Sequence, residues 1–381
     1  MNTRAIARPG QAASCYFRST VPDGYRKALV QITERCNLHC AHCFVSATEV
    51  GDTMALTDVE RHVVPQLARA GVTRITLTGG EPFAHPDPIG VARVFREAGM
   101  SVGFCTNATL TSADHVEALV ALGGVHVNVS LDGFAEASHG RFRGGRGSFQ
   151  TAVATVRRLA AAGLLQGLLC TPNNLADVDE YRALCEFAIE QGAAYVLMNP
   201  LSSMGRGVRS RGRLEAPAEA MRGIWGLTAP LAAQDLDVVH IRFPNDRDLP
   251  LAGCEAGRII YVFTPGDVTV CPYLVFAART PASLHDPAEF VVGNIFRDAD
   301  IAERLDAYRF HDRYRLGGNA TCQACDLNEA CGKGCPAAVV SAGGRIGDVD
   351  SEQCPRVGEH LGSAGRPLPS PSGRRLPVLP A

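Results

Sequence analysis

Three cysteines lie within eight residues near the start of the chain, at Cys36, Cys40 and Cys43. Their Cys-x3-Cys-x2-Cys spacing places three thiolates on one face of a cubane iron–sulfur cluster and supplies no fourth cysteine. An electron-transfer cluster normally has a cysteine on every iron, and a structural zinc site has four protein ligands. The spacing therefore predicts a [4Fe–4S] cluster with one open iron, which indicates catalysis. A zinc knuckle is the alternative, and it needs His39 or His42 as its fourth ligand.

The composition is that of an ordinary globular protein, with 46% hydrophobic and 20% charged residues in a chain of 381. The net charge of −2 excludes nucleic acid and an anionic membrane as expected partners. No run of 18 apolar residues predicts a membrane span, and residues 1–13 have no apolar signal region. Fourteen clustered cysteines without an export signal therefore predict metal ligation in a reducing cytoplasm. Buried or incidental thiols are expected at the cysteines outside the motifs, which are Cys15, Cys105, Cys170 and Cys185.

Short β-rich runs alternate with amphipathic stretches between residues 29 and 200. Strands are predicted at 29–33, 74–78, 101–106, 126–131, 164–171 and 194–199. Helices are predicted at 57–70, 89–98, 113–121, 149–162 and 177–191, and glycines follow their ends. Alternating strands and helices at this spacing favour a parallel α/β sheet. Six such units predict a partial (β/α)6 barrel.

The sequence pattern changes after the predicted barrel. We expect a loop at 202–213, a helix at 217–234, and a small cysteine-rich domain that metal holds together. The expected domains are an N-terminal extension at 1–25, the barrel at 26–235, and a bridging region with the cysteine-rich domain at 236–360. A disordered Pro-rich tail is expected at 361–381.

A second motif, Thr-Gly-Gly-Glu-Pro, ends the second predicted strand at residues 78–82. Gly79 and Gly80 let the backbone approach a ligand closely. Glu81 offers an acceptor for a ligand ammonium group. The alternative is a tight turn with an exposed glutamate.

Together the two motifs resemble those of the radical S-adenosylmethionine (SAM) superfamily, which has Cys-x3-Cys-x-φ-Cys after the first strand and Gly-Gly-Glu-Pro after the second. The φ position is usually aromatic and is His42 here, which keeps a planar ring. The resemblance implies that SAM chelates the open iron through its amino and carboxylate groups. It also implies that the turn formed by Gly79, Gly80, Glu81 and Pro82 binds the amino end of SAM.

Further matches follow along the predicted barrel. They are Thr106-Asn107-Ala108-Thr109, Ser130-Leu131-Asp132-Gly133, and the segment from His139 to Arg143 followed by Gly147-Ser148-Phe149. The resemblance implies that Asn107 belongs to the SAM site, that Ser130 and Arg143 contact the ribose and carboxylate of SAM, and that Asn199, Pro200 and Leu201 lie near its adenine. A solvated surface charge is the alternative for Arg143.

The C-terminal cysteines form a third pattern, with seven cysteines from Cys254 to Cys354. It resembles the SPASM extension of radical SAM enzymes, which holds two auxiliary [4Fe–4S] clusters; a zinc ribbon is the alternative. The resemblance assigns the outer cluster to Cys322, Cys325, Cys331 and Cys354. It assigns the inner cluster to Cys254, Cys271 and Cys335. Residues 255–261 contain no cysteine, so we expect an open or non-cysteine fourth site on the inner cluster.

The resemblance implies three [4Fe–4S] clusters and an oxidoreductase that cleaves SAM to a 5′-deoxyadenosyl radical, which abstracts a substrate hydrogen. An auxiliary cluster can take the remaining electron, so we expect net oxidation. A redox-neutral epimerisation needs a thiol donor, for which Cys170 and Cys185 are the candidates. An iron–sulfur carrier is the non-enzyme alternative, and it leaves the SAM motifs unexplained.

The expected substrate is a ribosomally made peptide precursor, which makes the protein a peptide maturase. The alternative is a radical dehydrogenase or epimerase acting on a small molecule such as an aminocyclitol or an amino sugar. Residues 1–25 are too few for a leader-binding domain, so a separate leader-binding protein is an expected partner. A flavodoxin- or ferredoxin-type electron donor is another.

Overall fold

A computed structural model describes residues 10–16, 21–22, 24–233 and 236–357. The Pro-rich tail predicted at 361–381 lies outside the described residues, as do residues 1–9, 17–20 and 23 of the predicted N-terminal extension. Among the described residues, no helix is both long enough and apolar enough to span a bilayer.

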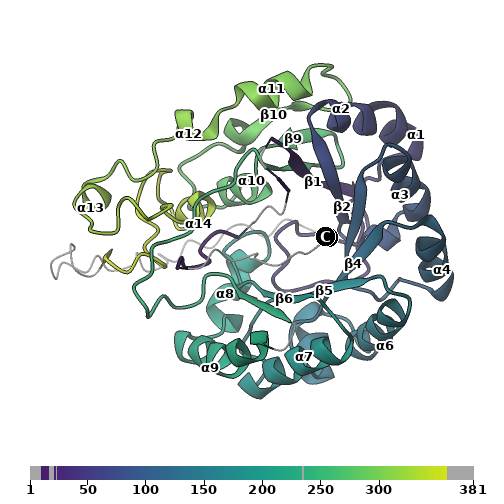
Figure 1. Ribbon diagram of the computed structural model, residues 1–381, viewed down its shortest axis with the longest axis horizontal. Helices are drawn as coiled ribbons and strands as arrows, with labels where there is room; N and C mark the ends of the chain where they lie inside the picture. Colours follow the sequence, from purple (N-terminus) through teal and green to yellow (C-terminus); the bar gives the residue numbers. More distant parts are fainter. Residues whose placement is uncertain (1–9, 17–20, 23, 234–235, 358–381) are drawn as a thin grey trace, which may run out of the picture.

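A parallel sheet forms the centre of the protein, and helices form an outer arc around it (Figure 1). Strands β1 to β6 are hydrogen-bonded in sequence order, and every neighbouring pair is parallel. Their bounds are β1 Arg26–Thr33, β2 Val72–Gly79, β3 Ser101–Thr106, β4 Val125–Ser130, β5 Leu165–Cys170 and β6 Tyr195–Met198. This arrangement confirms the predicted partial (β/α)6 barrel.

The helices between these strands pack their apolar faces on the sheet, as Val91 and Phe95 do with no exposed area. Their bounds are α1 Leu56–Asp58, the π-helical turn η1 Val59–Val63, α2 Val64–Arg69, η2 Pro82–Ala84, α3 Pro88–Glu97, α4 Ala113–Leu122, η3 Glu136–Gly140, α5 Arg141–Arg143, α6 Ser148–Ala161 and α7 Val178–Glu190. Glycines with positive φ follow several of these ends, for example Gly99 at φ 81° after α3. This is the left-handed conformation that glycine adopts without strain.

Strands from the later part of the chain extend the sheet at both edges. Strand β7 (Asp237–His240) pairs in parallel with β6, and β8 (Ile259–Val262) pairs in parallel with β1. Strands β9 (Asp267–Thr269) and β10 (Val291–Asn294) follow β8 in antiparallel order. The cysteine-rich region therefore shares one continuous sheet with the barrel.

The loop predicted at 202–213 is wrong in its second half, where helix α8 (Gly207–Leu214) forms. Its Gly/Arg/Ser composition has no apolar stripe, so periodicity could not reveal it. Polar contacts hold this region instead: Arg206 Nε donates to Cys40 O at 2.7 Å and Ser210 Oγ donates to Ala41 O at 2.7 Å. The helix predicted at 217–234 is α9 (Ala218–Thr228) followed by the 3-10 turn η4 (Ala229–Ala233).

Short helices dominate the C-terminal region, and Figure 1 shows α12, α13 and α14 on the side of the molecule away from α3 and α4. Their bounds are α10 Pro272–Ala278, η5 Pro287–Phe290, α11 Ile301–Ala307, α12 Phe310–Arg313, α13 Ala320–Gln323 and α14 Pro336–Ser341. The described residues of this region contain no helix longer than seven residues. Such short helices depend on tertiary contacts for their stability.

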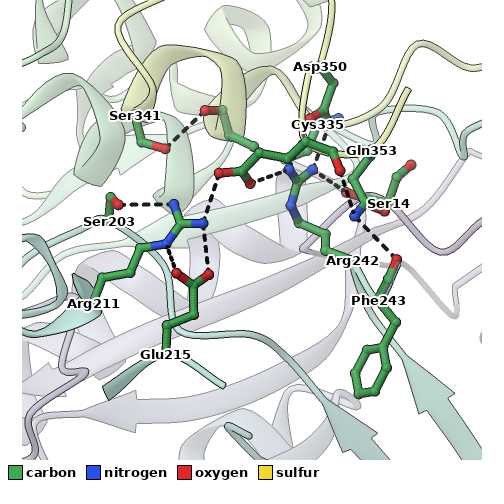
Figure 2. Close-up of polar contacts among 12 residues, drawn as sticks. Ser14, Ser203, Arg211, Glu215, Arg242, Phe243, Cys335, Ser341, Asp350 and Gln353 are labelled. Carbon is green, nitrogen blue, oxygen red and sulfur yellow. Dashed lines mark hydrogen bonds and ion pairs between the residues drawn. The ribbon is translucent and has the colours of Figure 1, made fainter. Parts of the chain in front are cut away.

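A buried ion pair joins the barrel edge to the end of the described chain (Figure 2). Arg242, just after β7, contacts Asp350 through two nitrogen–oxygen pairs at 2.6 and 2.9 Å. The two side chains are only 1% and 2% exposed. Glu352 accepts a further bond from Arg242 at 2.9 Å. The carboxylates offset the free-energy cost of burying the charged guanidinium.

We predict that Arg242→Ala lowers the free energy of unfolding by about 3–5 kcal/mol, because it leaves the Asp350 charge buried and unpaired. Chemical denaturation under anaerobic conditions measures this. Arg222→Ala is the matched control: Arg222 and Asp246 pair at 2.7 Å with 53% and 52% exposed side chains. Removing such a surface pair should cost at most about 1 kcal/mol. Equal losses for the two variants would contradict the role given to burial.

Candidate active site

A cavity of about 330 Å³ opens where the strands of the barrel end. The three cysteines of the first motif line it. So do the sequence-predicted residues Gly79, Gly80, Glu81, Asn107, Ser130, Arg143, Asn199 and Leu201. Pro82 is not among the lining residues; it is buried and begins the turn η2. The structure thus brings together eight residues that came from five separate segments of the sequence.

The first cysteine motif is a loop, and its three cysteines line this cavity. Leu38 N–H donates to Cys36 Sγ at 3.4 Å. Asn107 Nδ2 lies 3.9 Å from the same sulfur, and Arg143 Nη1 lies 4.0 Å from Cys40 Sγ. Burial raises the pKa of Cys36 to about 11 and that of Cys40 to about 12. A positively charged ligand is therefore needed to make both of them thiolates.

The donor set fits an iron–sulfur cluster. All fourteen cysteines lie in the described residues, and none is in a disulfide. Within the described part of the chain, no group of three or more His, Cys, Asp or Glu side chains is placed to hold a single metal ion. Three thiols around an open space match a larger cluster better than one zinc ion, which needs four close ligands.

The glycine pair allows two backbone segments to touch. A Cβ on Gly79 would lie 2.4 Å from Thr33 O, and one on Gly80 would lie 2.5 Å from Arg35 O. Gly80 N donates to Thr33 O and Glu81 N donates to Arg35 O, both at 2.9 Å. Glycine is thus needed at both positions so that the backbone can pack against residues 33–35, which lead into the cysteine loop. The sequence analysis expected glycine here for another reason, the close approach of a ligand to the backbone.

Glu81 is fully buried, so the alternative of an exposed glutamate is wrong. Its carboxylate accepts from Thr106 Oγ1 at 2.6 Å, from Asn107 N at 2.7 Å and from Phe83 N at 3.1 Å. Burial raises the pKa of Glu81 to about 7, although these three donors oppose the shift. A cationic ligand group beside it would restore the full negative charge.

Arg143 is buried as well, which rules out the solvated surface charge considered for it. Its Nε lies 2.7 Å from Asp132 Oδ2, and the other carboxylate oxygen of Asp132 accepts from Thr171 N at 2.7 Å. Arg143 and this backbone donor hold the pKa of Asp132 below its usual value, against the effect of burial. Sequence reasoning gave Asp132 no role, although it stands inside the quoted Ser-Leu-Asp-Gly motif.

The ring of His42 stacks on Phe142, with ring centroids 4.5 Å apart and planes 8° from parallel. Burial lowers the pKa of His42 to about 4, so the ring is neutral at physiological pH. Because it is neutral, planar and stacked, the His42 ring packs as the aromatic residue usual at this position would.

Asn199 supplies an unsatisfied polar atom at the cavity. Its backbone N–H donates to Cys170 O at 2.8 Å, which continues the pairing of β6 with β5. Its side-chain Oδ1 is buried and has no hydrogen-bond partner among the described residues. A buried acceptor of this kind fits a bound molecule that carries an N–H group.

Two cations lie deeper in the cavity, where Lys27 of β1 pairs with Arg74 of β2 in the sheet register. Burial lowers the pKa of Lys27 to about 8. Arg74 Nη2 lies 3.1 Å from His126 Nε2, and Tyr195 OH donates to Asn128 at 2.5 Å. Sequence reasoning missed this polar layer. The available signal was Arg74 at the start of the strand predicted at 74–78, whereas Lys27 precedes the strand predicted at 29–33 and falls within β1 only in the structure.

The C-terminal cysteines gather in two places. Burial and the charges of nearby Cys322, Cys331 and Cys325 raise the pKa of Cys354, so these four thiols are neighbours. The other three motif cysteines, Cys254, Cys271 and Cys335, line a second, smaller cavity. Of the cysteines outside the motifs, Cys105 and Cys170 line the large cavity and Cys15 lines the small one. Cys185 is buried in α7 and lines neither of these two cavities.

Comparison with known proteins decides the family. Residues 30–184 match the radical SAM superfamily. The chain is a radical SAM enzyme. The match spans β1 to α7 and includes the first cysteine motif and the glycine pair. The cysteine-rich region that follows lies outside this match, which ends at residue 184.

Relatives and solved structures extend the comparison beyond the barrel. The mycofactocin maturase MftC of Mycobacterium tuberculosis is 27% identical over 91% of this chain and 88% of its own length. An AdoMet-dependent heme synthase of Methanosarcina barkeri is 33% identical, but over only 47% of this chain and 52% of its own. The structure of Streptococcus suis SuiB bound to S-adenosylmethionine covers 87% of this chain and 77% of its own, with a TM-score of 0.69 and 18% identity. These similarities support the barrel-plus-extension fold for the radical SAM enzyme.

We predict that Asp132→Asn in the radical SAM enzyme lowers the free energy of unfolding by about 3–5 kcal/mol, because it leaves the buried Arg143 without its counter-charge. Chemical denaturation measures the loss. Asp179→Asn is the control, since Asp179 pairs with Arg182 at 3.1 Å on the surface, with a side chain 70% exposed. Its expected cost is below about 1 kcal/mol. A small effect of Asp132→Asn would show that Arg143 has another counter-charge.

Proposed function

We propose that the enzyme binds SAM at a [4Fe–4S] cluster held by Cys36, Cys40 and Cys43, and that it oxidises a ribosomally made peptide precursor. The observation that carries the first part is the convergence of three thiols and eight predicted SAM residues on one cavity. Reductive cleavage of SAM at this cluster would supply the 5′-deoxyadenosyl radical that abstracts a substrate hydrogen.

The residues of the cavity have separate tasks in this proposal. Glu81 accepts from the ammonium group of SAM, which would restore the negative charge that burial disfavours. Arg143, fixed by Asp132, faces the carboxylate of SAM. Asn199 Oδ1 accepts from the adenine amino group. The remaining proposed SAM-binding residues that line the cavity are Gly79, Gly80, Asn107, Ser130 and Leu201. The apolar residues of the lining, among them Leu29, Leu169 and Leu197, would limit the access of water to the reacting carbon.

The cations in the deeper part of the cavity discriminate between the two substrate classes. Lys27 and Arg74 attract an anionic group. A peptide offers carboxylates at its C-terminus and on acidic side chains. An aminocyclitol or amino sugar carries an ammonium group, which the same cations repel. This charge pattern favours a peptide.

Two comparisons agree with a peptide substrate. A relative from Mycobacterium tuberculosis that matches over most of both chains is named a mycofactocin maturase. A further SuiB structure, bound to the precursor peptide SuiA, covers 87% of this chain with a TM-score of 0.67. The heme synthase match covers less than half of this chain.

The C-terminal thiols would hold two auxiliary clusters. We assign the outer one to Cys322, Cys325, Cys331 and Cys354, and the inner one to Cys254, Cys271 and Cys335. The inner site is the nearer of the two to the substrate, because Tyr16 and Tyr273 line both its cavity and the large one. It would accept the electron left on the substrate after hydrogen abstraction. A flavodoxin- or ferredoxin-type donor in a reducing cytoplasm, and a separate leader-binding protein, complete the proposal.

We predict that anaerobic enzyme with dithionite and SAM forms 5′-deoxyadenosine, detected by liquid chromatography. Cys40→Ala should abolish the product while iron remains in the C-terminal region. Cys185→Ala, a buried thiol outside the candidate cluster sites, is the control and should retain activity. With the product established, a short precursor peptide encoded beside the gene should lose hydrogen in mass spectrometry. Absence of 5′-deoxyadenosine from enzyme with intact clusters would overturn the proposal.

We predict that Cys331→Ala lowers both iron content and thermal stability, because losing a cluster ligand removes folding free energy. Cys331 Sγ accepts from Lys333 N at 3.3 Å, so its loop is organised around the sulfur. Iron analysis and thermal unfolding of Cys331→Ala and Cys40→Ala provide the comparison. If each variant lost all of its iron, the two regions would not be independent.

A further inference from the structure

The small cavity next to the barrel is lined by four cysteines. Three belong to the C-terminal pattern, and the fourth is Cys15 from the N-terminal segment. Sequence reasoning treated Cys15 as incidental because no spacing links it to the others. It also left the inner cluster with an open or non-cysteine fourth site. The fold brings together thiols that are far apart along the chain.

Cys15 lies against one of the assigned ligands. The Cys15 thiol is near enough to Cys335 to raise the pKa of that thiol, as burial also does, whereas the nearby backbone N–H of Tyr16 lowers it. The exposed fractions of Cys15 and Cys335 are 5% and 3%. The Cys271 sulfur is near enough to Cys335 for their charges to interact, and the nearby backbone N–H groups of Leu274 and Tyr273 lower the pKa of Cys271 against the effect of burial. Backbone N–H donors aimed at sulfur stabilise thiolates.

Backbone pairing fixes the segment before Cys15. Ala12 N donates to Pro250 O at 2.9 Å, and Ala252 N donates to Ala12 O at 3.0 Å. Arg242 N donates to Ala13 O at 2.7 Å. The guanidinium of Arg242 donates to Ser14 O at 3.1 Å, as Figure 2 shows. These bonds tie Cys15 to the segment that leads directly to Cys254.

The residue after Cys15 is equally fixed. The Tyr16 ring stacks on Tyr273, with centroids 4.8 Å apart and planes 13° from parallel. The Arg242 guanidinium lies over the Tyr16 ring, 5.3 Å from its centroid. Tyr273 is two residues from Cys271 in the same chain segment. With both of its neighbours held, the Cys15 side chain has a defined place in the cavity.

We propose that Cys15 is the fourth ligand of the inner auxiliary cluster, which is therefore closed by four thiolates. The inference rests on the proposed function, since it requires a cluster at Cys254, Cys271 and Cys335. A cluster capped on every iron transfers electrons and offers no site for substrate or solvent. The inner cluster then acts as an electron acceptor and does not bind the substrate.

Glu255 is the competing ligand, because its side chain also lines the small cavity. A thiolate is the stronger candidate, since iron–sulfur clusters are held by cysteine and the remaining three ligands are thiols. The test must therefore separate the two side chains.

The experiment uses the full chain with Cys36, Cys40 and Cys43 changed to Ala, so that only C-terminal clusters remain. Cyanide is the probe for an open iron, and EPR and Mössbauer spectra with iron and sulfide content are the readouts. In this background we expect no change on adding cyanide. Adding Cys15→Ser should produce a cyanide-dependent shift and a [3Fe–4S] signal after mild oxidation. Adding Cys185→Ala or Glu255→Gln should leave the spectra unchanged.

Three results would overturn the proposal: a cyanide shift while Cys15 is present, spectra of Cys15→Ser identical to those of the Cys185→Ala control, or the same change caused by Glu255→Gln. The first of these needs no variant of Cys15, so it decides the matter even if Cys15→Ser does not fold. Absence of C-terminal iron from the background itself would instead remove the auxiliary clusters of the proposed function, and with them this ligand. If C-terminal iron were present and Cys15→Ser had no effect on the spectra, only the assignment of Cys15 as a ligand would be wrong.

Discussion

The backbone contact between residues 33–35 and residues 79–81 is the constraint on which the site depends. Two N–H···O bonds join these segments, and neither Gly79 nor Gly80 has room for a Cβ. The contact directs the chain into the cysteine loop at the end of β1 and places Glu81 beside Thr106 and Asn107. Asn107 in turn reaches Cys36. A side chain at either glycine would push the thiols away from the residues proposed to hold SAM.

Charge is distributed unevenly along the cavity, so its two ends favour ligand groups of different charge. The two buried carboxylates, Glu81 and Asp132, lie near the thiols and are satisfied by backbone donors or by Arg143. Lys27 and Arg74 lie at the other end of their strands. A zwitterionic molecule at the thiol end and an anionic one at the far end would both meet complementary charge. The order of polar residues along β1 and β2 thus supports two ligands bound end to end.

The sequence predicted the parts of this fold that repeat a local pattern. The strand predicted at 101–106 coincides with β3, because it is a short β-rich run between two helix-like stretches. Helix α8 was missed because polar contacts to residues 40 and 41 hold it in the absence of an apolar stripe. Strand β8 was not identified because its four residues are all buried, which leaves no alternation to detect. The cysteine motifs were found because their spacing is local.

Cys15 could not be linked to the other cysteines from the sequence, because only the tertiary structure brings it into the small cavity with them. Its position depends on pairing of residues 12–14 with residues 242 and 250–252, and no sequence separation encodes that. Arg242 adopts a positive φ of 54°, which is costly for a residue with a side chain. Its two carboxylate partners and its contacts to residues 13–16 compensate for that cost. A strained, buried arginine is thus the point at which the barrel edge, the N-terminal segment and the last described residues meet.

The same segment also forms part of the wall between the two cavities. Tyr16 and Tyr273 are stacked, and both line the large cavity and the small one. An electron leaving a substrate radical in the large cavity would therefore cross an aromatic pair to reach thiols on the other side. If Cys15 closes the cluster there, the N-terminal segment supplies both a ligand and half of this aromatic wall. Substrate and inner cluster would then exchange electrons without contact, which suits an oxidation in which the cluster keeps its ligands.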